Sequence, residues 1–175
     1  PVYAAAVIWD KDLENQEEIK FIKDSKKLTP KRRKIAYDFL IKNLKFFGIG
    51  SASNIEIDKI NILEATKLAM KRAVNNLETK LKKDMTLELL IIDGVRWEGC
   101  FDIPSHSIVK GDDKYLSISA ASILAKEEHD IAINKYVGNN PEMNDKYDLL
   151  KNKGYGTKKH LIGLEKHGPS DYHRR

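Results

Sequence analysis

The sequence predicts an α/β fold, in which strands are covered by helices, and two stretches carry this prediction. Residues 87–94, LELLIIDG, form a nearly unbroken aliphatic run, which is typical of a strand that is buried on both faces. Residues 108–126, IVKGDDKYLSISAASILAK, indicate a strand, a turn and a helix whose small side chains can lie close against a sheet. At 175 residues the chain fits one domain with its own core, so we treat residues 1–175 as a single domain.

The first third of the chain predicts two strands with a helix between them. Residues 2–9 are largely apolar and are followed by a charged connector, which indicates a strand. Thr29 and Pro30 mark a helix start, because threonine can accept hydrogen bonds from free backbone N–H groups and proline has no N–H to leave unpaired. Residues 46–52 predict the second strand, in which two glycines mark either a bulge or a close approach of another backbone.

A long helix is predicted after the second strand. Ser53 and Glu56 have the spacing of a capping box, and we expect the helix to restart near Asn61. From there apolar residues recur at spacings of three and four, which predicts a single stripe facing the core. This stripe consists of Leu63, Thr66, Met70, Val74, Leu77 and Leu81.

The C-terminal part predicts a loop and a final helix. Residues 153–157, KGYGT, place Tyr155 between two glycines, which let the backbone approach a ligand closely and leave the aromatic ring projecting. Thr157 is placed to cap an amphipathic helix that ends at Gly168 and Pro169.

Charge and composition favour a polyanionic partner. The net charge is +5, and Lys and Arg gather in residues 20–34 and again in residues 151–175. Cys100 is the only cysteine, which excludes an internal disulfide and a zinc site with several cysteine ligands. No apolar run approaches the ~18 residues that a membrane-spanning helix needs. We therefore expect a soluble, cytoplasmic protein that acts as a monomer and has no membrane partner.

Acidic residues end two of the predicted strands. Asp93 closes the aliphatic run at residues 87–94, and Asp112 and Asp113 follow the strand that opens residues 108–126. An Asp-Gly pair such as Asp93 and Gly94 is more often simply a turn. Carboxylates at neighbouring strand ends nevertheless lie where α/β proteins commonly place their chemistry.

A series of blocks along the chain resembles one known family. The blocks are AAAVI from Ala4, DSKKLT from Asp24, IGSAS from Ile49, NILEATKLAMKRAV from Asn61, IDG ending at Gly94, VKGD ending at Asp112, SISAASILAK from Ser117, KGYGT from Lys153 and HGPSDYHRR from His167. They span almost the whole chain, and on them the chain is similar to ribonuclease HII, the type 2 ribonuclease H family. The resemblance implies a ribonuclease H-like mixed sheet flanked by helices, with a helical C-terminal segment.

The resemblance also implies an activity and a metal site. The expected activity is endonucleolytic hydrolysis of the RNA strand of RNA–DNA hybrids, including single ribonucleotides in duplex DNA, by two metal ions. It would leave 3′-hydroxyl and 5′-phosphate ends. Mn²⁺ or Mg²⁺ is the implied cofactor, and both ions prefer hard oxygen ligands. Asp93 and Asp112 match catalytic, metal-binding carboxylates of the family, and the KGD register favours Asp112 over Asp113.

The substrate contacts carried over from the family lie elsewhere in the chain. Tyr155 would stack on the sugar at an RNA–DNA junction, where the 2′-hydroxyl distinguishes RNA from DNA. Ser25 and Lys26 would contact backbone phosphates. Asp130 would support the site from the helix behind it.

The chain departs from the family at its start. In the family, the AAAVI strand is preceded by a first strand that ends in an Asp-Glu-Ala-Gly-Arg-Gly segment, whereas this sequence begins at Pro1, just after it. Two of the family's four metal-binding carboxylates therefore have no counterpart here, and we expect an N-terminally incomplete domain. Because that strand is central in the family's sheet, we predict either a repaired sheet or marginal stability. The alternative function is a catalytically inactive remnant that binds nucleic acid.

Overall fold

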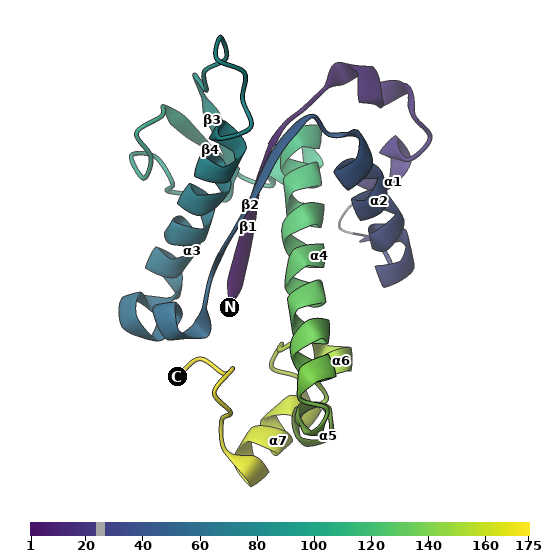
Figure 1. Ribbon diagram of the computed structural model, residues 1–175, viewed down its shortest axis with the longest axis vertical. Helices are drawn as coiled ribbons and strands as arrows, with labels where there is room; N and C mark the ends of the chain where they lie inside the picture. Colours follow the sequence, from purple (N-terminus) through teal and green to yellow (C-terminus); the bar gives the residue numbers. More distant parts are fainter. Residues whose placement is uncertain (24–26) are drawn as a thin grey trace.

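The computed structural model describes residues 1–23 and 27–175 and confirms the α/β class. Strand β1 (Val2–Ile8) pairs antiparallel with β2 (Phe46–Ala52), and β3 (Leu90–Asp93) pairs parallel with β4 (Ser105–Ile108). The helical elements are η1 (Lys11–Asn15), α1 (Ile19–Lys23), α2 (Pro30–Asn43), α3 (Asn54–Glu78), η3 (Gly111–Asp113), α4 (Leu116–Asn139), α5 (Glu142–Tyr147), α6 (Leu149–Asn152) and α7 (Lys158–His167). Figure 1 shows α3 and α4 on either side of the β1–β2 ribbon, with α5 to α7 gathered at one end of α4.

Strand β1 is covered by helices on both faces, and its side chains alternate between these two helical layers. Ala4 belongs to a cluster with alanines of α3, whereas Ala5 and Val7 pack against a cluster formed by α1, α2 and α4. This explains why the strand is apolar throughout rather than at every second position. The strand predicted at residues 2–9 is confirmed, and it ends one residue earlier than expected.

Helix α3 lies unusually close to β2. A Cβ atom added to Gly48 would come 2.0 Å from the carbonyl oxygen of Ala73, and one added to Gly50 would come 2.1 Å from that of Ala69. The strand residues pair without interruption from Val2 with Ala52 to Ile8 with Phe46, so the two glycines mark a close backbone approach rather than a bulge.

This close approach makes the predicted stripe of α3 wrong in part. The face turned to the sheet consists of small residues, among them Ala65, Ala69 and Ala73, because only a short side chain fits between helix and strand. Leu63, which begins the predicted stripe, is 52% exposed. Val74 and Leu77 are buried as predicted and line a cavity beside the sheet together with Thr66 and Met70, whereas Leu81 lies beyond the end of α3.

The predicted helix starts are confirmed. The Thr29 hydroxyl accepts a hydrogen bond from the Arg32 N–H, and Ser53 and Glu56 form both halves of a capping box. Asn61 has a φ of 67°, which interrupts α3 where a restart was expected, and Thr157 caps α7.

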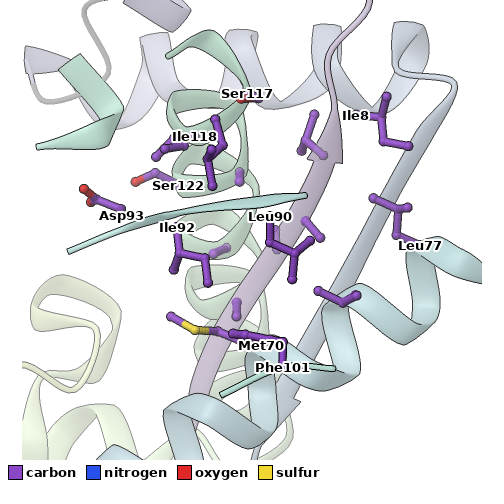
Figure 2. A pocket seen from close by; sticks show the side chains of 18 of the residues that line it. Ile8, Met70, Leu77, Leu90, Ile92, Asp93, Phe101, Ser117, Ile118 and Ser122 are labelled. Atoms are coloured by element: carbon purple, nitrogen blue, oxygen red, sulfur yellow. The ribbon is translucent and has the colours of Figure 1, made fainter. Parts of the chain in front are cut away.

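The two sheets stand apart in the part of the chain that is described, so the prediction of a repaired sheet is wrong. A cavity of about 410 Å³ lies between them, with walls from β1, β3 and α4. Leu90, Ile92 and Ile118 are among the side chains that line it (Figure 2). Marginal stability stays a prediction.

The helical C-terminal segment is confirmed. A cluster that includes Ile133, Val137, Tyr147 and Leu149 joins α4 to α5 and α6. Among residues 1–23 and 27–175, no helix is long and apolar enough to cross a membrane.

Candidate active site

Asp93 and the turn that contains Asp112 are joined directly by a hydrogen bond. Asp93 is the last residue of β3, and its Oδ1 atom accepts a hydrogen bond of 2.8 Å from the backbone N–H of Gly111. Because Asp112 follows Gly111 in η3, this bond brings the two predicted carboxylate residues to neighbouring positions at the ends of a parallel strand pair.

Gly111, which donates this hydrogen bond to Asp93, has little room for a side chain. It is buried, and a Cβ atom there would lie 2.6 Å from Cδ1 of Ile118 and 3.4 Å from Oδ1 of Asp93. The side chain of Ile118, on the first turn of α4, would have to move to admit it. Glycine in the VKGD block therefore spares a shift of Ile118, while the bond to Asp93 uses only the backbone N–H.

The turn interpretation of the Asp93-Gly94 pair also holds. Gly94 has a φ of 105°, and the indole N–H of Trp97 donates a 2.9 Å hydrogen bond to the backbone carbonyl of Asp93. The backbone of Asp93 thus builds the turn, while one oxygen of its side chain holds the neighbouring loop.

The donor set at this place fits a hard divalent cation only in part. Asp93 and Asp112 both offer carboxylate oxygens, the type of ligand that Mg²⁺ and Mn²⁺ prefer. Within the described residues, no group of three or more His, Cys, Asp or Glu side chains is arranged to hold a metal ion. Two carboxylates alone make a weak cage, because each missing ligand has to be replaced by water.

Tyr155 stands at a second surface, on the loop between α6 and α7. The residue is 58% exposed, and the Lys126 ammonium lies 5.1 Å from its ring centroid and 3.4 Å from its hydroxyl oxygen. The His129 ring is 6.2 Å away on the same side of α4. An exposed aromatic ring beside a cation is suited to stacking on a planar or sugar group of an anionic ligand.

A hollow of about 690 Å³ opens beneath this ring. Its lining includes the basic residues Lys126, Lys153 and Arg174, as well as Pro1 at the start of the chain. Lys126 was not singled out from the sequence, although it is the last residue of the SISAASILAK block. Its place beside Tyr155 depends on the packing of α4 against the loop of residues 153–157.

Asp130 forms an ion pair with Arg33, which is far away in the sequence. It is buried, and its Oδ2 atom accepts a 2.7 Å hydrogen bond from Nη2 of Arg33, while Nε of the same guanidinium bonds Glu127. These ion pairs tie α2 to α4. Arg33 is consequently engaged inside the protein, although the sequence places it within the basic cluster of residues 20–34.

His129 also contacts Asp130, at 3.2 Å between Nδ1 and Oδ1. Burial of the imidazole lowers the pKa of His129, and this outweighs the opposing effect of the Asp130 carboxylate. The ring is therefore neutral at pH 7 and contributes shape and hydrogen bonding rather than charge. Ser25 and Lys26, the predicted phosphate contacts, lie outside the described residues.

Known proteins resemble this chain over nearly its whole length. The family model described as Ribonuclease HII matches residues 1–175. The chain is 45% identical over 173 residues to ribonuclease HII of Bacteroides fragilis, covering 99% of this chain and 79% of that relative. It is 42% identical over 180 residues to ribonuclease HII of a Wolbachia strain from Drosophila simulans, covering 100% of this chain and 81% of the relative.

A solved structure shares the fold at lower identity. The crystal structure of ribonuclease H2 from Pyrococcus horikoshii OT3 superposes with a TM-score of 0.63 at 23% identity, covering 95% of this chain and 81% of that one. At this level of identity the likeness shows the fold alone.

Proposed function

This chain belongs to the ribonuclease HII family of nucleases, and from that membership we propose that it hydrolyses the RNA strand of RNA–DNA hybrids. The proposed substrates include single ribonucleotides in duplex DNA, and the proposed products carry 3′-hydroxyl and 5′-phosphate ends. The observation that carries the proposal is the hydrogen bond from Gly111 to Asp93, which holds two acidic positions together at the strand ends.

Asp93 and Asp112 are the residues that would hold the metal. When bound, paired Mn²⁺ or Mg²⁺ ions would supply an activated water and neutralise charge on the attacked phosphate. The contribution of the chain is to fix the first carboxylate: Asp93 is oriented through its bond to the Gly111 N–H, and the turn at Gly94 fixes its backbone.

Substrate recognition is assigned to the surface around Tyr155. The ring would stack on the sugar at the junction between RNA and DNA, and the basic hollow beneath it would attract the phosphate backbone. Lys126 joins these two roles, because its ammonium lies over the ring and lines the hollow. Ser25 and Lys26 are also proposed to contact backbone phosphates, on the basis of the family resemblance alone.

A second candidate function is a nucleic-acid-binding remnant without catalysis. Two observations favour it for residues 1–175 as they stand: the described residues hold no metal-binding group of three or more acidic, His or Cys side chains, and the two sheets do not join. The basic hollow and Tyr155 would still bind a hybrid. Such binding would weaken with salt, at about −0.7 to −0.9 in log affinity per log salt for each phosphate contact.

The two candidates separate in a cleavage assay. The substrate is a DNA duplex with one ribonucleotide, with Mn²⁺ or Mg²⁺ present, and the proteins are residues 1–175 and the same chain extended by the family's first strand. We expect cleavage by the extended protein. Salt-dependent binding by residues 1–175 without cleavage would favour the remnant for that chain, whereas an inert extended protein would contradict the enzyme proposal.

An Asp93→Asn variant of the extended protein tests the metal role separately from the fold. Asparagine keeps an oxygen to accept the bond from Gly111, so the urea midpoint of unfolding is expected to stay within experimental error, while the negative charge is lost. We expect cleavage to fall at least about a hundredfold, as for loss of one preorganised electrostatic group in an active site. Full activity in Asp93→Asn would remove Asp93 from the site.

A further inference from the structure

Two histidines connect the C-terminal residues to the loop that carries Tyr155. His173 lies in residues 168–175, and its Nε2 atom is 2.9 Å from Nε2 of His160 on α7. The Nδ1 atom of His160 lies 2.9 Å from the backbone carbonyl oxygen of Tyr155. The three residues thus form a continuous line of hydrogen bonds that ends on the peptide of the exposed tyrosine.

The direction of each bond follows from the two ends of this line. The backbone N–H of Ser170 donates to Nδ1 of His173 at 3.0 Å, so that nitrogen carries no proton and a neutral His173 has its proton on Nε2. The Tyr155 carbonyl can only accept, so Nδ1 of His160 carries the proton and its Nε2 does not. His173 therefore donates to His160, and His160 donates to Tyr155.

Both histidines of this line pack against one aromatic ring. His160 is 4% exposed, and both imidazoles contact the Tyr147 ring edge-on, at 4.6 Å between centroids for His173 and 6.1 Å for His160. Desolvation and the nearby His160 lower the pKa of His173. A proton added to Nε2 of His160 would point at the N–H of His173, so the line is complete only when both rings are neutral.

The loop itself has little packing to hold it. Gly154 has a φ of 80°, and a Cβ atom added to Gly156 would meet no atom within 4 Å. The peptide that follows Tyr155 is held instead through its carbonyl oxygen, which accepts hydrogen bonds from His160 and, at 2.8 Å, from the N–H of Thr157. This peptide and the preceding one, whose N–H donates to the Asn152 carbonyl, together set the direction in which the Tyr155 side chain leaves the backbone.

The other end of the line is anchored to the body of the fold. The Asn54 side-chain amide, at the start of α3, donates to the backbone carbonyls of Asp171, at 2.7 Å, and His173, at 3.1 Å. Tyr172 stacks on Tyr136 of α4, with ring centroids 4.0 Å apart and planes inclined by 12°. Residues 168–175 are thus held by two helices that both pack on β1.

We propose that His173 and His160 are positioning residues. Residues 168–175 are docked on α3 and α4, and the hydrogen bonds of the two histidines hold the Tyr155 loop relative to these docked residues and thereby set the orientation of the Tyr155 ring. This inference rests on the proposed role of Tyr155 at the RNA–DNA junction for its functional consequence, but the hydrogen-bond relay stands independently of that role. Both histidines also line the hollow at Tyr155, and their proposed effect on the ring passes through the carbonyl of Tyr155.

The first test is a measurement of imidazole tautomers on the unmodified chain. Long-range ¹H–¹⁵N NMR spectra at pH 7.5 distinguish ring nitrogens with and without a proton. We expect Nδ1 of His173 and Nε2 of His160 to carry no proton. For His160 this is the tautomer that is less common in solution. Any other pair of tautomers, or rapid averaging of either ring, would overturn the relay without reference to activity.

The second test breaks and restores the donor at position 173. Gln places an amide N–H close to the place of Nε2, so His173→Gln should retain the relay, whereas His173→Leu should remove it. We expect His173→Leu to shift the backbone amide signals of residues 155–157 and His173→Gln to shift them much less. His106→Leu, a change of an exposed histidine on β4 away from the relay, is the matched control and should leave them in place.

Activity of the cleavage-competent extended protein then tests the functional consequence. Loss of the hydrogen bond between His173 and His160 should lower the preference for a lone ribonucleotide over a continuous RNA–DNA hybrid about tenfold in His173→Leu, with partial rescue in His173→Gln. Unmoved loop signals in His173→Leu would overturn the relay. Moved loop signals with an unchanged preference would uphold the relay and overturn the junction role of Tyr155.

Discussion

The buried ion pairs of Arg33 give the sharpest prediction about stability. The guanidinium, with its side chain 12% exposed, bonds both Glu127 and Asp130, whose side chains are 8% and 9% exposed. Arg33→Met would keep most of the side-chain volume but leave two buried carboxylates without this cation. Removing one partner of a buried ion pair costs about 3–5 kcal/mol, because the remaining charge stays desolvated.

Urea unfolding followed by far-UV circular dichroism measures this loss. With a slope of about 2 kcal/mol/M, a loss of about 3–5 kcal/mol lowers the midpoint by roughly 1.5–2.5 M. A domain of this size has about 5–15 kcal/mol of stability in all, so a loss of about 5 kcal/mol unfolds a chain at the lower end of this range even without urea. Lys34→Met is the matched control on the same helix, because the Lys34–Asp38 pair is exposed and is worth about 0–1 kcal/mol.

A further variant separates lost charge compensation from lost packing. In Arg33→Met combined with Glu127→Leu and Asp130→Asn, no buried charge remains at this place, and replacement of a whole buried ion pair is often neutral or stabilising. We expect this triple variant to recover more than half of the stability lost in Arg33→Met. If Arg33→Met were no more destabilising than Lys34→Met, or the triple variant no better than the single one, the reasoning would be refuted.

Three further predictions concern packing, pH and recognition. Gly50→Ala should destabilise by about 1–3 kcal/mol or more, because its Cβ atom would meet the Ala69 carbonyl, while Gly138→Ala, with nothing within 4 Å, should be neutral or stabilising in the same urea titration. Burial lowers the pKa values of His129 and His173, so stability should be constant above pH ~6.5 and fall as pH drops below it, because the unfolded chain then binds more protons. Urea midpoints that stay constant from pH 7.5 to 5.5 would contradict this. In the extended protein, Tyr155→Ala should weaken discrimination for a lone ribonucleotide more than binding of duplex, and an unchanged cleavage position and rate would remove Tyr155 from the junction.

The sequence by itself determined the local features of this protein. The capping box of Ser53 and Glu56, the start of α2 after Thr29 and the interruption at Asn61 all depend on residues within one or two turns of each other. Strand β2 was predicted with its observed bounds, because its apolar residues follow one another along the chain. The family resemblance was equally a property of the sequence, because its blocks keep their order along the chain.

Only the tertiary structure decided which distant groups meet. Arg33 and Asp130 are 97 positions apart, and neither residue type indicates the other as its partner. Which face of α3 is buried depended on the short distance between α3 and β2. Gly48 and Gly50 allow this distance, and the apolar stripe of the sequence did not reveal it. Strand β3 is shorter than the aliphatic run because only residues 90–93 find partners in β4.

The candidate site divides in the same way. The sequence indicated Asp93, Asp112 and Tyr155 as separate positions, whereas the structure supplied the bond through Gly111, the cation beside Tyr155 and the two histidines behind it. Short-range patterns fix backbone conformation, because it depends on neighbouring residues. Contacts between side chains from different elements depend on how closely those elements pack, and that distance is set by the whole fold.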